Sequence, residues 1–110
     1  GVEDARITQI GDTYYITYVG VSRNGIVTAL ASTKDFRTYD RHGVILPPEN
    51  KDVVLFPKKI NGTYWAIHRP YPFTRFGMPE MWLASSSTFG LCASVDHWPT
   101  KVTMPTSACA

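Results

Sequence analysis

Short segments rich in β-branched and aromatic residues follow one another along the chain, separated by turn residues. Such segments are typical of β-strands, because a pleated surface accommodates rings and branched side chains well. No segment shows apolar residues at the 3.6-residue spacing of an amphipathic helix, so we expect little helix. The segments predict strands near residues 2–10, 13–20, 26–32, 42–46, 53–60, 63–69, 80–86 and 101–104.

The chain contains an internal repeat of about fifty residues. Residues Ile10–Tyr18 align without gaps with Ile60–His68, each a turn followed by Thr-Tyr and a second aromatic residue. Residues Leu30–Phe36 align with Leu83–Phe89 in the same order. Two copies of one unit, each with about four predicted strands, are typical of the blades of a β-propeller.

The repeat predicts an all-β fold of about two four-stranded antiparallel β-propeller blades. Gly11-Asp12 and Asn61-Gly62 are expected to form the tight turns of two hairpins. A blade buries its faces against neighbouring blades, so two blades alone would leave sheet faces exposed. We therefore expect a fragment of a longer protein. The expected divisions are a first blade at 1–48, a second blade at 49–104 and an irregular tail at 105–110.

The composition and charge argue against several classes of protein. Hydrophobic residues make up 44% of the 110 residues and charged residues 18%, as in a folded globular protein. The formal net charge of +2 is too small for a nucleic-acid-binding surface. No run of about 18 apolar residues is present to span a membrane. No charged segment followed by an apolar core marks a signal peptide, so we expect a cytoplasmic protein.

Two cysteines, Cys92 and Cys109, lie in the last fifth of the sequence. They could close one small loop, but such a sparse pair is more often two free thiols. Neither has a second ligand at the spacing of a metal site, so we expect no metal. Asn61-Gly-Thr63 matches a glycosylation acceptor, although a hairpin turn explains these residues better.

Polar residues cluster at the open end of the second predicted hairpin. A two-residue turn at Asn61-Gly62 would pair the flanking residues and place Leu55 opposite His68, unless Pro57 introduces a bulge. The beginning of the first strand and the end of the second then meet away from the turn. Four polar residues gather there: Lys51, Asp52, His68 and Arg69.

The first predicted hairpin repeats this arrangement. The same construction places Asp4, Arg6 and Thr17 on one face and aligns Asp4 with Val54 at an offset of 50 residues. In a propeller the inner strands begin around one end of the central channel. Acids and bases that are far apart in the sequence would therefore surround one pocket, which predicts a functional site.

These residues also have structural interpretations. Asp4 and Arg6 lie two positions apart on a strand, where a pair is as often a structural ion pair as a functional one. His68 could be an ordinary buried histidine. The aromatic segment Tyr71–Pro79 suits the faces of sugars, but it could equally cover a hydrophobic edge.

In combination, several segments resemble glycoside hydrolase family 130, the β-mannoside phosphorylases and related β-mannosidases. The segments are Gly1–Ile7, Tyr14–Tyr18, Leu30–Phe36, Ile45–Pro57, Lys59–Gly62 and His68–Pro70. The resemblance covers about residues 1–86 and implies a five-bladed propeller. Residues Ser86–Trp98 depart from the family pattern, and the tail after Met104 has no strand periodicity.

The resemblance implies a role for each polar residue. Asp4 takes the place of the acid in the family's Glu-Asp-Pro-Arg motif, with Ala5 in place of the proline. The acid would protonate the glycosidic oxygen through a sugar hydroxyl while inorganic phosphate attacks the anomeric carbon. Phosphate is the co-substrate, and the resemblance implies no cofactor. This inverting displacement gives mannose 1-phosphate. Four residues match basic positions around phosphate and sugar, and one matches a sugar-binding position: Arg6, Lys51, His68 and Arg69, with Asp52.

One tension and three alternatives accompany this hypothesis. A general acid must carry a proton, which the positive charge of Arg6 on the same face would oppose unless burial dominates or Arg6 points to the ligand. A β-mannosidase of the family would need a second carboxylate as base. A glycan-binding propeller and an inactive gene fragment are the other two. We expect the chain alone to be inactive, because an incomplete channel cannot preorganise a site. The full-length protein could form a homo-oligomer.

Overall fold

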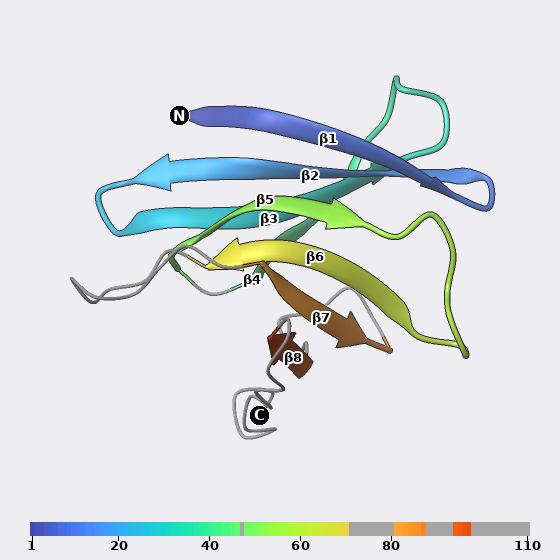
Figure 1. The fold of residues 1–110 in the computed structure, drawn as a ribbon. Coiled ribbons are helices and arrows are strands. Elements are labelled where there is room, and N and C mark those ends of the chain that lie inside the picture. The colour runs from blue at the N-terminus through green and yellow to red at the C-terminus, as the bar shows by residue number, and fades with distance from the viewer. Residues whose placement is uncertain (47, 71–80, 88–93, 98–110) are drawn as a thin grey trace.

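The computed structural model describes residues 1–46, 48–70, 81–87 and 94–97. Within these ranges the strands are β1 (Val2–Ile10), β2 (Thr13–Ser22), β3 (Gly25–Thr33), β4 (Asp40–Leu46), β5 (Asn50–Leu55), β6 (Tyr64–Pro70), β7 (Trp82–Ser86) and β8 (Ser94–His97). They form two four-stranded antiparallel sheets, in the orders β1-β2-β3-β4 and β5-β6-β7-β8 (Figure 1). The described part contains no helix that is long and apolar enough to cross a bilayer.

The predicted all-β fold with two four-stranded blades is confirmed. Six of the expected strands appear within two residues of their predicted bounds. The strand expected at 53–60 is instead β5 at Asn50–Leu55, which begins earlier and ends before Pro57. The eighth was expected near residues 101–104, which lie outside the described residues, and the fourth strand of the second sheet is instead β8 at Ser94–His97. The expected tail at 105–110 and both cysteines also lie outside the described residues.

The second hairpin closes through the turn that the sequence predicts. Ile60 and Thr63 exchange both backbone hydrogen bonds, at 2.9 and 3.1 Å. Asn61 and Gly62 between them both have positive φ angles, 51° and 75°. Two such residues form the primed turn whose twist matches that of antiparallel strands, and Asn-Gly favours it because neither residue is strongly strained there.

A β-bulge near the beginning of β1 and of β5 changes the predicted alignment of the two units. In β1–β2, Asp4 and Ala5 together lie opposite one residue, and in β5–β6, Asp52 and Val53 do the same. Asp4 and Asp52 both have left-handed backbones, with φ angles of 53° and 57°. Asp4 therefore corresponds to Asp52, and the predicted alignment of Asp4 with Val54 is wrong.

The spacing between bulge and turn explains this correction. Arg6 and Ile10 are four positions apart, whereas the equivalent Val54 and Ile60 are six apart. The second hairpin thus holds two extra residues in its first strand, near Pro57, so the equivalent positions before them are offset by two fewer residues than those at the turn. Leu55 consequently pairs with Ala66. The simple hairpin construction predicted His68 as its partner, which is wrong.

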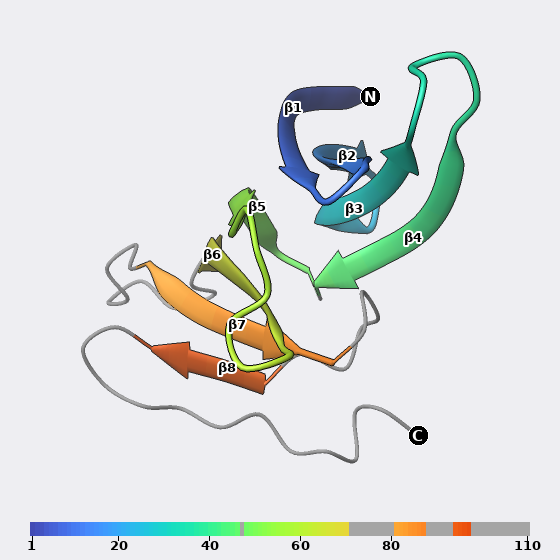
Figure 2. The same cartoon turned by 90° about the vertical axis from the view of Figure 1, so that its right-hand side faces the viewer.

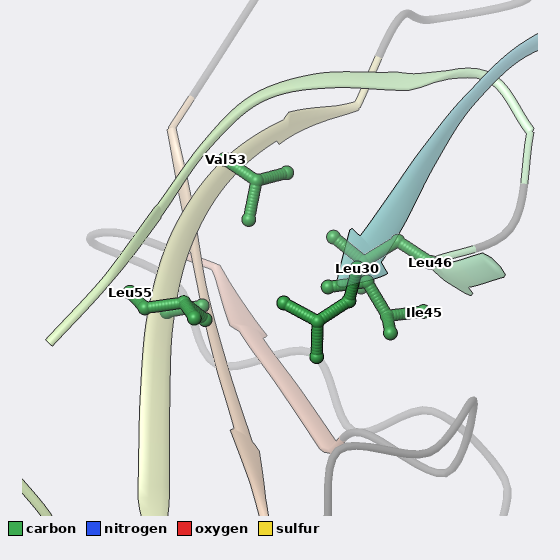
Figure 3. Packing of buried hydrophobic residues seen from close by; sticks show 6 residues of the cluster. Leu30, Ile45, Leu46, Val53 and Leu55 are labelled. Carbon is green, nitrogen blue, oxygen red and sulfur yellow. The ribbon is translucent and has the colours of Figure 1, made fainter. Parts of the chain in front are cut away.

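The two sheets pack with β5 against one face of the first sheet, where it contacts β1, β2 and β3 (Figure 2). An apolar cluster fills the space between them (Figure 3). Its buried members are Leu30, Ile45 and Leu46 from the first sheet and Val53, Leu55 and Ala66 from the second. Burying one large aliphatic side chain stabilises a fold by about 1.5–3 kcal/mol, so this cluster holds the sheets together.

Three threonines reinforce the contact by donating hydrogen bonds to β5. The bonds run from Thr8 Oγ1 to Leu55 O (3.4 Å), from Thr17 Oγ1 to Val53 O (2.8 Å) and from Thr28 Oγ1 to Asn50 O (3.1 Å). β5 is the edge strand of its sheet, so these carbonyl groups have no neighbouring strand to pair with. The hydroxyl groups of the first sheet therefore supply the partners that an edge strand needs when it is buried.

Candidate functional site

The predicted site residues lie at one end of the two packed sheets. β1 and β5 begin there and β2 and β6 end there, on the left of Figure 1. This end carries all six candidates: Asp4, Arg6, Lys51, Asp52, His68 and Arg69. The antiparallel pairing brings them together because the beginning of each inner strand meets the end of the next strand.

Asp52 lies between two arginines that come from different sheets. The Arg69 Nε donates a hydrogen bond to Oδ2 at 2.8 Å, and Arg69 Nη2 lies 2.6 Å from the same oxygen. The Arg6 Nη2, from β1, lies 3.5 Å from Oδ1. Asp52 therefore connects the two sheets through charged side chains as well as through the apolar cluster.

The charge of Asp52 is fixed by these neighbours. The hydrogen bond from Arg69 is the largest cause that holds the pKa of the Asp52 carboxyl below its usual range. Partial burial opposes this, and the charges of Arg69, Arg6 and Lys51 add to it. Asp52 is thus ionised, and its oxygens face guanidinium groups.

The cluster carries more positive than negative charge. Arg6, Lys51 and Arg69 surround the single carboxylate of Asp52. About a third to a half of each Asp52, Arg69 and Arg6 side chain is exposed, and exposed ion pairs contribute only about 0–1 kcal/mol to stability. The excess of cations at a partly open surface is suited to an anion, since guanidinium groups bind phosphate or carboxylate through paired N–H donors.

Asp4 differs from Asp52 although the two occupy equivalent bulge positions. Asp4 is exposed, and within the described part of the chain it makes no hydrogen bond or ion pair. Arg6 turns to Asp52 instead, so the structural ion pair considered for Asp4 and Arg6 does not form. The bulge accounts for this, because it breaks the regular alternation that would place the two side chains on one face.

His68 lies behind the charged cluster and is only 2% exposed. Its Nδ1 is 2.7 Å from the Oδ1 of Asn50, which identifies Nδ1 as the protonated nitrogen because an amide oxygen only accepts. Burial lowers the pKa of His68 to about 4, so the ring is neutral near pH 7. Its Nε2 is buried and has no hydrogen-bond partner among the described residues.

The sequence-based reasoning missed Asn50. This buried residue fixes the tautomer of His68 through its side chain and accepts the bond from Thr28 through its carbonyl group. The sequence offers one signal that could have indicated Asn50: it directly precedes Lys51, the first residue of the predicted polar cluster.

Among the described residues, no group of three or more His, Cys, Asp or Glu side chains is placed to hold a metal ion.

Comparison with known proteins identifies the family. The model of glycoside hydrolase family 130, described as beta-1,4-mannooligosaccharide phosphorylase, matches residues 1–94. The chain belongs to glycoside hydrolase family 130. The predicted family is thus confirmed, and the two sheets are two blades of the five-bladed propeller that its phosphorylases form.

Several family 130 relatives are phosphorylases. The chain is 52% identical over 86 residues to the β-1,2-mannobiose phosphorylase of Listeria innocua, which covers 78% of this chain and 24% of the relative. It is 37% identical over 108 residues to a 1,2-β-oligomannan phosphorylase of a Thermoanaerobacter species, which covers 96% of this chain and 33% of the relative. The chain therefore spans about a quarter to a third of the length of these relatives.

The fold agrees with solved structures of the same kind. The Listeria innocua phosphorylase in complex with β-1,2-mannobiose matches with a TM-score of 0.75 over 79% of this chain and 24% of that one. A glycoside hydrolase-like protein of Bacteroides ovatus matches with a TM-score of 0.65 over 81% of this chain and 29% of that one. At 18% identity, the second likeness shows the fold alone.

Proposed function

We propose that this chain is part of a β-mannoside phosphorylase that transfers a mannosyl group to inorganic phosphate. The observation that carries the proposal is the pair of equivalent bulges. They place Asp4, which makes no ion pair with the described residues, at the same end as a cationic cluster. Membership of a family whose relatives are named as phosphorylases supports it. No cofactor is needed, because phosphate is itself the second substrate.

Asp4 is the acid of the proposed reaction. Its proton passes through a sugar hydroxyl to the glycosidic oxygen while a phosphate oxygen attacks the anomeric carbon from the opposite face. The bond from the anomeric carbon to the glycosidic oxygen breaks, and the shortened sugar leaves with a new hydroxyl group. The mannosyl group ends as mannose 1-phosphate with inverted configuration. Asp4 is exposed and makes no ion pair with the described residues, so its carboxyl group is open to a sugar hydroxyl.

Arg6, Lys51 and Arg69 are the proposed phosphate-binding cations. A phosphate dianion needs several positive donors, and Asp52 engages only part of the N–H groups of the two arginines. Asp52 is proposed to border the sugar. The buried, neutral His68 is proposed to support the end of β6 behind the cluster, where Asn50 holds its ring, and not to contact the substrate.

We propose that the linkage cleaved is β-1,2. The relatives at 52% and 37% identity are named for β-1,2-linked mannosides, whereas a β-1,4-mannooligosaccharide phosphorylase of Ruminococcus albus is 30% identical. A β-mannosidase is not favoured, because these relatives are phosphorylases and the second nearby carboxylate, Asp52, is held by arginines.

The proposal can be tested in a chimaera in which residues 1–86 replace the equivalent segment of the Listeria innocua phosphorylase. We expect β-1,2-mannobiose and phosphate to give mannose 1-phosphate, with less turnover of the β-1,4 isomer. Asp4→Asn should lower kcat by about 100- to 10,000-fold, the usual contribution of a general acid. The control is Asp12→Asn, which changes an exposed aspartate of the β1–β2 turn. Free mannose released equally fast without phosphate would refute phosphorolysis.

A further inference from the structure

A buried polar pair lies directly behind the cationic cluster of the second sheet. The Asn50 Oδ1 accepts a hydrogen bond of 2.7 Å from the His68 Nδ1, and the two residues are 4% and 2% exposed. The hydrogen bond offsets the cost of taking both groups out of water. Apolar side chains of the same shape can replace such a pair at little cost, so packing alone does not require it.

The pair spans the bulge of β5. His68 is the residue of β6 opposite the two bulge residues, and Asn50 lies two positions before Asp52, the first of them. Lys51 comes directly after Asn50, and Arg69 comes directly after His68. Successive side chains of a strand point to opposite faces, so the two cations project from the other face of the same backbone segments. An anchor on one face thus orients the cations on the other.

The first sheet forms the same bulge without such a pair. The strand registers place Val2 at the position equivalent to Asn50, and Tyr18 at the position equivalent to His68. The bulge aspartate of the first sheet nevertheless has a φ angle of 53°, close to the 57° of the second. The backbone of the bulge therefore does not depend on a buried polar pair.

The flanking positions differ between the sheets in the same way. Lys51 pairs with Arg69 across the second hairpin, whereas the equivalent pair of the first hairpin is Glu3 with Val19. The sheet that carries these two cations also carries the polar pair, and the other sheet carries neither. The pair thus accompanies the cations and not the bulge.

The first sheet also holds Asn50 in place. The Thr28 Oγ1 of β3 donates a hydrogen bond of 3.1 Å to the carbonyl oxygen of Asn50, and Thr28 is 1% exposed. The backbone of Asn50 is therefore fixed from one sheet and its side chain by the ring of His68 in the other. Buried hydrogen bonds that lock a supporting residue also restrict the binding groups beside it.

We infer that Asn50 is a positioning residue, which acts together with His68 and Thr28 to set the place of Lys51 and Asp52 for phosphate. The inference rests on the proposed function, since it takes the cationic cluster to bind phosphate. Asn50 acts without contact to the substrate, because its side-chain oxygen is buried and bound to His68. A displacement of about 1 Å in a positioned group can cost about 100-fold in rate, so loss of this anchor should weaken phosphate binding.

Apolar replacement of either partner in the chimaera tests the inference. Asn50→Leu and His68→Leu should each raise the KM for phosphate about 10-fold, with less than about a 3-fold change in kcat. The Kd of inorganic phosphate, measured by calorimetry, should rise by the same factor. His68→Asn keeps an N–H donor close to the place of the His68 Nδ1, so its KM and Kd should lie within about 3-fold of the unaltered chimaera.

Ser32→Ala is the matched control. It removes a side-chain hydrogen bond of the same length, 2.7 Å between Ser32 Oγ and His42 Nε2, at the other end of the first sheet. It should lower the Tm as the loss of a hydrogen bond does, and it should leave the KM and Kd for phosphate unchanged. If the two leucine variants also lowered the Tm but left both constants unchanged, the pair would be structural only and the inference would be wrong.

Thr28→Val provides a test that leaves the polar pair intact, should the leucine variants not fold. It removes only the hydrogen bond to the carbonyl group of Asn50, so the Kd of phosphate should rise about 3-fold. An unchanged Kd in this variant would contradict the role of the first sheet in holding Asn50.

Failure of the proposed function would give a different result. The unaltered chimaera would then bind phosphate without forming mannose 1-phosphate, and the Kd values of the variants would still decide the role of Asn50. If the unaltered chimaera bound no phosphate, both the function and the inference would be wrong.

Discussion

At the scale of single residues, the site contrasts two aspartates in equivalent backbone positions. Asp4 and Asp52 share a left-handed backbone within a bulge, but Asp52 is bound by Arg69 and Arg6 while Asp4 makes no ion pair in the described part of the chain. Equal backbone geometry thus gives one carboxylate that positions cations and one that is available to a substrate. The neighbours, and not the fold of the strand, determine the difference.

Removal of the Asp52 carboxylate tests its positioning role. In the chimaera, Asp52→Ala should raise the KM for phosphate about 10-fold, because both guanidinium groups lose the anchor that orients them. If Asp52 acted only through its negative charge, its removal would relieve the repulsion of phosphate and lower that KM. The Tm should change little, since the ion pairs are partly exposed. Asp12→Ala, at the turn, is the control.

The buried His68 predicts a pH dependence of stability. Its pKa is about 4 in the folded chain and about 6.5 when unfolded, so the unfolded state binds more protons between these values. Stability that is complete above pH 6.5 should therefore fall as the pH drops toward 4, by up to about 3 kcal/mol. Urea unfolding of the 110-residue chain at pH 7 and pH 4.5 measures this. His68→Gln should show a much smaller difference between the two pH values.

At the scale of elements, β5 is held by hydroxyl groups as well as by apolar packing. Thr17 and Thr28 are almost fully buried and donate to carbonyl groups that β5, as an edge strand, cannot pair within its own sheet. A buried carbonyl without a donor costs about 1–3 kcal/mol. The contact between the sheets therefore depends on the donors as well as on the area buried.

Replacement of one donor by a residue of the same shape tests this dependence. Thr17→Val should lower the free energy of unfolding by about 1–3 kcal/mol, because the carbonyl of Val53 remains buried without its bond. Thr8→Val should cost less, since its bond is longer, at 3.4 Å, and only partly buried. Urea denaturation of the two variants side by side gives the comparison. Equal effects would show that the hydroxyl group of Thr17 is not what holds β5.

At the scale of the whole molecule, the chain provides two blades and one side of a channel. The charged end is assembled from both sheets, with Arg6 from the first meeting Asp52 and Arg69 of the second. The relatives are three to four times as long, so the remaining blades would complete the surroundings of the substrate.

The isolated chain is therefore expected to be inactive. Incubation of the 110-residue chain with β-1,2-mannobiose and phosphate should give no mannose 1-phosphate, because an incomplete channel does not preorganise the reacting groups. The chimaera, at the same concentration, is the positive control. Product formed by the isolated chain and lost in Asp4→Asn would show that two blades suffice.

The sequence by itself determined the two four-stranded sheets, the Asn61-Gly62 turn and the end of the sheets at which the polar residues gather. These features depend on local patterns, namely alternation, turn residues and a repeat, which act over neighbouring positions. Only the tertiary structure decided that Asp4 corresponds to Asp52, that Arg6 turns away from Asp4, and that Asn50 fixes the buried His68. The physical reason is that bulges carry little sequence signature and that the deciding contacts, Asn50 with His68 and Arg6 with Asp52, join residues 18 and 46 positions apart.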